Sequence, residues 1–362
     1  MGRFRLPHVI QTDRRVPRGA SQKGGSWETM RTTEKQNGAA PERKGKLMQK
    51  LHNENSVLIL LIAVSMLIFS FVVPNFLTAG NLFNLLIQAS NIGIPAIGLT
   101  FIIITAGIDL SLPTNMACSA ILGCSIMAKT QSVFLGILSI MLIATFFGMV
   151  NGFSVSKLKM VPMIVTLAIQ TLNVGISEYY TQGTSIGGMP ESFTRIFAGN
   201  LFGVVPVSVV VFLALAVVMH LLLSKTIFGR QLFQTGINEK AAQVNGVNTT
   251  RIIFLIYLIG GVMAGINGVL TAARLTAAGP SMGPASAFTN IVCACVLGGA
   301  SVWGGKGTIF GTVLGSIVMV IITNVMNLLN VNFFTTFVIK GIIIILVCYI
   351  DILRNKAKVK ER

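Results

Sequence analysis

Charged side chains are scarce in this sequence. Asp, Glu, Lys and Arg make up 11% of its 362 residues, whereas an ordinary soluble domain carries about 25%. The hydrophobic share is 53%, and several apolar runs reach the ~20 residues that cross a bilayer core. The shortage of charge therefore excludes a set of soluble domains and predicts an all-α polytopic membrane protein.

Histidine and cysteine are also few. The three histidines are scattered along the chain. The cysteine count is odd, without paired C-x-x-C motifs, which argues against a disulfide framework or a metal site. All five cysteines stand in apolar segments, as small hydrophobic residues do: Cys118, Cys124, Cys293, Cys295 and Cys348.

Catalytic and nucleotide-binding signatures are missing as well. No G-x-S-x-G or H-E-x-x-H motif occurs. The run GASVWGGKGT at 299–308 fails as a phosphate loop, because Ala300 stands where the motif needs glycine and Gly307 where it needs Ser or Thr. We therefore expect no cofactor and no enzymatic activity in this chain.

Positive charge is concentrated at the two ends. The formal net charge is +17, and the basic residues cluster in the first fifty residues and in the closing RNKAKVKER. Lys and Arg flank membrane spans on the cytoplasmic side, so this charge requires no nucleic acid partner. Residues 1–50 read as a disordered basic tail, with Met30 or Met48 as candidate translation starts, and residues 354–362 as a cytoplasmic tail.

Apolar runs predict a transmembrane domain at 51–353 with about ten helices. Ten crossings from the inside place both termini, the SKLK loop at 156–159 and residues 225–251 in the cytoplasm; Lys129 and Arg274 are minor exceptions. The expected spans lie near 56–73, 81–106, 112–128, 133–155, 161–180, 204–224, 252–272, 286–299, 308–330 and 334–351.

Two of these spans are irregular. Residues 81–106 are long for one crossing, and Pro95 is expected to kink or break them. Residues 286–299 are short and run into LGGASVWGGKG. Interrupted helices at membrane depth indicate a transport pathway, although glycine can also serve close helix packing.

Asp109 is the single Asp, Glu, Lys, Arg or His between Ser56 and Ala128. A carboxylate inside a membrane span costs about 2.5–3.5 kcal/mol on insertion scales. Three interpretations stay open: Asp109 caps a helix at a cytoplasmic loop, shapes a solute pathway, or forms an ion pair between helices. The candidate pathway residues are polar: Gln88, Asn91, Thr105, Asp109 and Ser111.

The longest polar stretch between spans reads QTGINEKAAQVNGVNTTR, at 234–251. Asn can cap a short helix whose first turn carries an acidic residue, and Gly can end it. Small residues on such a helix suit the groove of another protein, although an ordinary loop helix is the alternative. The candidate coupling residues, in a segment at about 234–250, are Asn238, Glu239, Ala241, Ala242 and Gly246.

Taken together, these segments resemble the permease subunits of ribose-type ABC importers, a family that also serves other monosaccharides and the autoinducer-2 signal. The matching runs cover about residues 56–351: NLLIQASNIGIPAIGLTFIIITAGIDLS, NGFSVSKLKMVPMIVTLAIQTL, GINEKAAQVNGVNTTR, AARLTAAGPSMG and VLGGASVWGGKGTIFGTVLG.

The resemblance implies a bacterial plasma-membrane importer with two permease copies, alike or different. It also implies a cytoplasmic ATPase subunit that receives the E-x-A-A-x-x-x-G segment and an extracytoplasmic sugar-binding protein. The chain departs from the family's G-G-I-D-L-S-V-G-S at Ala106 and at 112–114, and Phe288 replaces a common acidic residue. These departures leave the transported solute open.

Two other functions remain as alternatives. A secondary, ion-coupled transporter usually needs more than one buried ionisable group near the midplane, and this sequence offers Asp109 and little else. A membrane enzyme is disfavoured by the missing acid–base and metal clusters.

Overall fold

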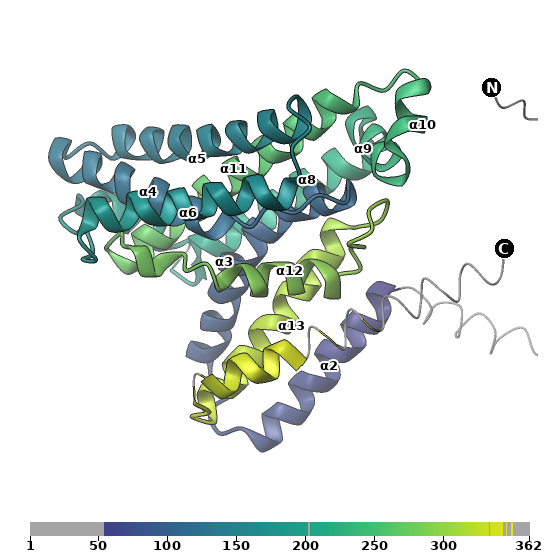
Figure 1. The fold of residues 1–362 in the computed structure, drawn as a ribbon. Helices are drawn as coiled ribbons and strands as arrows, with labels where there is room; N and C mark the ends of the chain where they lie inside the picture. Colours follow the sequence, from purple (N-terminus) through teal and green to yellow (C-terminus); the bar gives the residue numbers. More distant parts are fainter. Residues whose placement is uncertain (1–53, 202, 333, 343–344, 346–348, 350–362) are drawn as a thin grey trace, which may run out of the picture. The chain divides into compact units, whose positions relative to one another are not determined.

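The computed structural model describes residues 54–349 except 202, 333, 343–344 and 346–348 (Figure 1). The two predicted tails, 1–50 and 354–362, lie outside the described residues. In chain order the elements are α2 (Glu54–Val72), α3 (Ala79–Ile104), α4 (Leu112–Thr130), α5 (Val133–Ser156), α6 (Pro162–Thr181), α7 (Glu191–Phe197), β1 (Asn200–Leu201), β2 (Val205–Pro206), α8 (Val207–Lys225), α9 (Ile227–Ile237), α10 (Glu239–Val244), α11 (Thr249–Leu275), η1 (Pro280–Met282), α12 (Ala287–Leu297) and α13 (Ile309–Leu328).

The prediction of an all-helical membrane protein is confirmed for the described residues. The only named sheet in them is a two-stranded antiparallel hairpin, which pairs Asn200 with Pro206 and Leu201 with Val205. Six helices are long and apolar enough to cross a membrane: Ala79–Ile104, Val133–Ser156, Val207–Lys225, Thr249–Leu275, Pro280–Leu297 and Ile309–Leu328. The count of ten spans and the orientation of the chain ends stay predictions.

Several helices begin at a hydroxyl cap. The side chain of Thr78 accepts a hydrogen bond from Asn81 N, and that of Ser132 accepts one from Leu135 N. Thr308 caps α13 in the same way. Such caps satisfy backbone donors that the first helical turn leaves free, which sets the starting points of these long apolar helices.

Helices α5 and α11 pack side by side at close range (Figure 1). A Cβ atom added at Gly148 would lie only 2.9 Å from the Cα of Gly261, and one added at Gly261 would lie 3.0 Å from the Cα of Gly148. Small residues let helix backbones approach within a membrane, where dispersion contacts must replace the hydrophobic effect. This contact holds α11 at the centre of the helical domain.

Helix α3 is continuous through Pro95, so Pro95 does not break it, and the alternative of a kink stays a prediction. Proline removes the N–H that would bond the carbonyl four residues earlier, which here belongs to Asn91. That carbonyl instead accepts a hydrogen bond from Asn267 Nδ2 on α11, at 3.1 Å. A neighbouring helix thus supplies the missing donor, which is how proline is tolerated inside membrane helices.

Candidate functional site

The chain breaks between α3 and α4, at residues 105–111. Ala106 adopts a left-handed conformation with φ 58°, and Gly107 N donates to Ile102 O at 3.1 Å. The carbonyl of Ile108 accepts a hydrogen bond from the hydroxyl of Tyr257, at 3.3 Å. Tyr257 lies in the interior of α11, a candidate span. The break therefore lies at membrane depth.

Asp109 is 1% exposed and is held by hydrogen bonds within this break. Its Oδ1 accepts from Ser111 N at 2.9 Å and from Ser111 Oγ at 2.6 Å. Asn151 Nδ2, from inside α5, lies 3.4 Å from both carboxylate oxygens and donates to Ser111 Oγ at 2.9 Å. No described cation forms an ion pair with Asp109, which disfavours an ion pair between helices.

The hydroxyl of Ser111 bonds Asp109 and not the start of helix α4. The residue occupies the position before α4, but its side chain makes no capping hydrogen bond to that helix. The hydroxyl is directed to Asp109 instead. Pro113 does stand in the first turn of α4, as the sequence predicts. The two polar residues of the break therefore fix the start of α4 as a pair.

A cavity of about 240 Å³ lies beside this break, between the middle of α3, the start of α4, the outer part of α11, η1 and the start of α12. Its polar lining residues are Asn91, Asn267, Thr271, Arg274, Ser281 and Asn290. Thr271 Oγ1 donates to Asn91 Oδ1 at 3.4 Å. The wall thus includes a small hydrogen-bonded amide and hydroxyl network in an apolar surrounding.

The five predicted pathway residues do not form one cluster. Asn91 lines the cavity, while Asp109 and Ser111 share the buried break. Gln88 is half-buried on α3 and does not line this cavity, and Thr105 donates to Ile102 O at 2.9 Å. Whether these residues contact a solute stays a prediction.

Sequence reasoning missed the polar face of α11 that forms one wall of the cavity. Asn267, Thr271 and Arg274 follow one another at spacings of four and three residues, which places them on one side of a helix. Three polar residues at that spacing inside an apolar span are the signal that could have found this wall.

The candidate coupling segment forms the last turn of α9 and the short helix α10. Asn238 caps α10 through a hydrogen bond from Ala241 N to its Oδ1, at 3.0 Å. Gly246, after the helix, has φ 81°, a conformation that glycine adopts without cost. The predicted start and stop of this helix are confirmed.

Glu239 connects α10 to two other parts of the chain. Its Oε1 accepts from Lys159 Nζ at 3.0 Å, in the connection between α5 and α6. The same oxygen accepts from Thr249 Oγ1 and from Gln243 Nε2, both at 3.2 Å. The carboxylate therefore positions α10 on the helical domain.

The expected contact of Ala242 with a partner needs correction. Ala242 is 3% exposed and belongs to the main hydrophobic core, because the turn of α10 directs it toward the other helices of the chain. The exposed apolar side chains of this region are Ile237, at 73%, and Val244, at 88%. These two residues flank α10 and form the apolar part of its outer surface.

The end of α3 touches both α9 and the Gly-rich segment at 298–308. Gly305 N donates to Ile104 O at 2.8 Å. A Cβ atom at Gly236 would lie 1.9 Å from the same carbonyl, and one at Gly304 would lie 2.9 Å from Gly236 O. The glycines thus permit three backbones to meet directly next to the break that holds Asp109.

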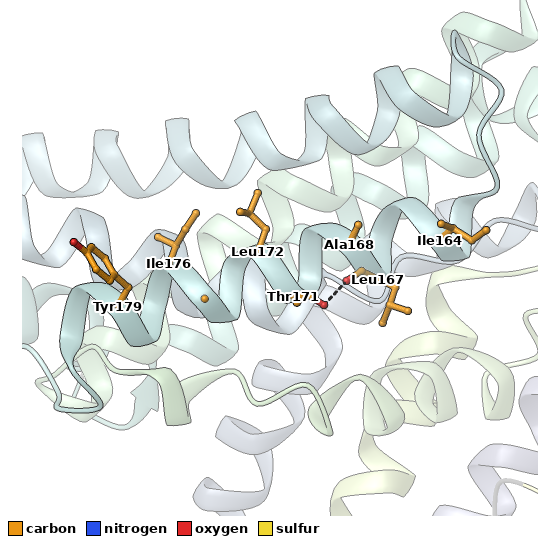
Figure 2. A pocket seen from close by; sticks show the side chains of 8 residues that line it. Ile164, Leu167, Ala168, Thr171, Leu172, Ile176 and Tyr179 are labelled. Atoms are coloured by element: carbon orange, nitrogen blue, oxygen red, sulfur yellow. Dashed lines mark hydrogen bonds between the residues drawn. The ribbon is translucent and has the colours of Figure 1, made fainter.

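An apolar groove of about 880 Å³ runs along the outer face of α6 (Figure 2). Figure 2 shows its side chains projecting from successive turns of this helix, from Ile164 to Tyr179. Thr171 bonds its own helix by donating to Leu167 O at 3.0 Å. At Gly175 an added Cβ atom would meet nothing within 4 Å, so this face is open.

A family of permease components and three named permeases resemble this chain. A family model described as "Branched-chain amino acid transport system / permease component" matches residues 81–348. The ribose import permease protein RbsC of Bacillus subtilis (strain 168) is 35% identical over 306 residues, which are 84% of this chain and 93% of that protein. The RbsC protein of Escherichia coli (strain K12) is 32% identical over 308 residues, 83% of this chain and 94% of its own length. The L-arabinose transport system permease protein AraH of the same strain is 33% identical over 286 residues, 79% of this chain and 87% of that protein.

Proposed function

Because this chain belongs to the family of permease components of ABC importers, we propose that it forms the membrane pathway for a monosaccharide or a related sugar-like solute. The chain is a membrane transport component and not an enzyme, and ATP hydrolysis is assigned to a separate subunit. The observation that carries the proposal is identity of about a third, over most of both chains, to permeases named for ribose and arabinose.

The cavity supports a sugar over an amino acid. Its polar lining consists of amides, hydroxyls and the guanidinium of Arg274, with no carboxylate. An amino acid carries an ammonium group, whose removal from water is costly without an acidic partner. A neutral sugar needs only hydrogen-bond partners, which this lining provides. The proposed substrate class is therefore that of the ribose and arabinose permeases, and not the branched-chain amino acids for which the family model is described.

The proposed membrane topology has about ten spans with both chain ends in the cytoplasm. The six candidate spans and the shorter apolar helix at Leu58–Val72 form the first group of crossings. Helices α4 and α6 and the region 334–351 are proposed as the others. The distribution of Lys and Arg supports the orientation. The tails at 1–50 and 354–362 then extend into the cytoplasm, and α9 and α10 face it as well.

The cytoplasmic ATPase subunit is proposed to dock at α9 and α10. Ile237 and Val244 give this surface an exposed apolar part, and Asn238, Ala241 and Gly246 surround it. Glu239 anchors α10 to the connection between α5 and α6. Movement of the ATPase would then be transmitted to the end of α3 through the contact between Gly236 and Ile104. From there it would reach the adjoining break that contains Asp109.

A second permease copy, identical or closely related, is proposed to cover the groove on α6, and an extracytoplasmic sugar-binding protein to dock on the opposite side of the membrane. The groove combines a large open volume with the small residues Ala168 and Gly175, which allow helices to pack closely in a membrane. The remaining apolar surface of the spans faces lipid.

Transport in proteoliposomes tests the proposal. The permease is reconstituted with and without its ATPase subunit, with the binding protein and labelled ribose or arabinose outside. We expect uptake only with the ATPase and ATP. Uptake that follows a proton or sodium gradient without ATP would favour an ion-coupled transporter instead, although Asp109 is the only buried carboxylate among the described residues, which gives that mechanism little support.

A further inference from the structure

We propose that the 240 Å³ cavity between α3, α4, α11 and α12 is a binding site, inside each single permease chain, for one neutral polyhydroxylated solute of single-ring size. The identity of that solute rests on the proposed sugar import. The site is separate from the groove on α6, because the two share no lining residue. Each copy in a dimer would therefore hold its own solute.

An unpartnered amide oxygen marks the polar wall. Asn267 is 2% exposed, and its Nδ2 bonds the carbonyl of Asn91 that Pro95 leaves free. Its Oδ1 has no hydrogen-bond partner among the described residues, although the residue lines the cavity. A buried carbonyl oxygen without a partner destabilises the protein. The oxygen is covered in this structure, so a hydroxyl group of a solute would donate to it after a small rotation of the amide.

The amide of Asn290 lies in the same lining, in the first turns of α12. Its side chain forms no hydrogen bond with any residue that the structure describes, so its donors and its acceptor are both available. Amide groups suit sugars because each hydroxyl of a sugar both donates and accepts. Two amides from different helices can therefore engage two hydroxyl groups of one ring.

Part of the wall is apolar. Pro95, Leu112 and Met116 line the side formed by α3 and the first turns of α4. Apolar side chains with a few placed polar groups are the usual composition of small-molecule sites. Here they suit the C–H surface of a sugar ring. The same turns of α4 follow directly on Asp109 and Ser111, so the hydrogen bonds of the break hold this wall in place.

Size and access agree with a small solute. Pockets for drug-sized ligands measure about 300–1,000 Å³, and this cavity is below that range. Arg274, Leu275 and Ser281 line it and are exposed, so the cavity opens at the end of α11. In the proposed topology that end is extracytoplasmic, where a binding protein would release its solute.

Protection of an introduced cysteine tests the site. The full-length Ala287→Cys variant, purified in lipid nanodiscs, is treated with a small thiol-reactive methanethiosulfonate reagent, with D-ribose, L-arabinose or L-leucine added. Ala287 lines the cavity at the start of α12 and makes none of the proposed hydrogen bonds. We expect ribose or arabinose at millimolar concentration to slow labelling several-fold, and leucine to have no effect. Thr289→Cys is the matched control, because Thr289 follows two residues later on α12 but does not line the cavity. The unsubstituted protein measures background from the native cysteines.

The labelling outcomes test the proposed solute site independently of the proposed sugar import. Protection by a sugar at Ala287→Cys alone supports the site, even if ATP-driven uptake of that sugar fails and the transport proposal falls. Absence of protection by both sugars overturns the site, even where the intact importer transports them. Protection by leucine alone overturns the polyhydroxylated ligand. Equal protection at Thr289→Cys means a general conformational effect and also overturns the site.

Discussion

Lys159 Nζ lies 3.0 Å from Glu239 Oε1, and this ion pair joins helix α10 to the connection between α5 and α6. Both side chains are about half exposed. Exposed ion pairs contribute about 0–1 kcal/mol because water screens them and both side chains lose freedom. The pair therefore serves to position α10 more than to stabilise the fold.

Replacing Glu239 by glutamine removes the charge and keeps an oxygen that can accept from Thr249 and Gln243. We expect the unfolding temperature of the purified permease to change by a few degrees at most, since the pair contributes at most ~1 kcal/mol. Co-purification of the ATPase should fall modestly and become less sensitive to salt. A loss of folded protein on this substitution would contradict the positional role of the pair.

Val244→Arg should weaken ATPase binding, whereas Ala242→Arg should impair folding. Val244 is exposed on α10, so arginine there leaves the permease folded and weakens the proposed ATPase contact, with a roughly tenfold loss of binding for each ~1.4 kcal/mol. Ala242 is buried in the permease core, where extra volume typically costs about 1–3 kcal/mol. Ala242→Arg should therefore reduce the yield of folded permease.

The measurement is the amount of monomeric permease after detergent extraction, together with the ATPase that co-purifies with it. Full ATPase retention and wild-type uptake in Val244→Arg would remove α10 from the docking role. Normal folding of Ala242→Arg would contradict the burial of that residue.

Local sequence signals predicted local structure well in this chain. Asn238 was expected to cap α10 because an amide cap depends on neighbours within one turn, and it does so. The direction of Ala242 could not be predicted, because it depends on how α10 rests on distant helices through Lys159. The helix break near Asp109 was expected, whereas its partner Asn151 comes from another span. Likewise, nothing near Pro95 in the sequence indicates that Asn267 supplies the missing donor.

Asp109→Asn tests whether charge or hydrogen bonding matters in the break. The asparagine oxygen can still accept from Ser111, and Asn151 Oδ1, which has no partner among the described residues, can accept from the new amide. We expect stability close to wild type. Asp109→Leu leaves the backbone N–H and the hydroxyl of Ser111 without their acceptor, and each such buried group costs about 1–3 kcal/mol.

Thermal unfolding in detergent and uptake in proteoliposomes check both variants. If Asp109→Asn is as stable as wild type and its uptake and ATP hydrolysis are unchanged, the charge has no role in transport. Strong loss of uptake in this folded variant would instead indicate that the carboxylate itself shapes the pathway. Equal stability of Asp109→Leu would contradict the hydrogen-bonded role of Asp109.

Gly236→Ala should disturb the junction between α9 and the end of α3. Its Cβ atom would lie 1.9 Å from Ile104 O and 3.0 Å from Gly305 N, so at least one backbone must move. We expect a stability loss of about 1–3 kcal/mol, as for other overpacked contacts, and a larger loss of uptake than of ATP hydrolysis. Gly80→Ala is the control, because nothing lies within 4 Å of a Cβ atom there. Similar behaviour of the two variants would exclude a special role for this junction.

Gly175→Cys tests whether a second permease copy covers the groove on α6. An added Cβ atom at Gly175 meets nothing within 4 Å in the single chain, so the variant should fold. If two copies pack through this face, mild oxidation should link them, because a disulfide forms when two Cα atoms approach to about 4.4–6.8 Å.

Phe134→Cys on α5 is the matched control, since Phe134 is strongly exposed but lies away from the groove. A covalent dimer with Gly175→Cys alone, seen on a non-reducing gel of native membranes, is the expected result. Cross-linking at Phe134→Cys with none at Gly175→Cys would place the contact between copies on another face and leave the α6 groove to lipid.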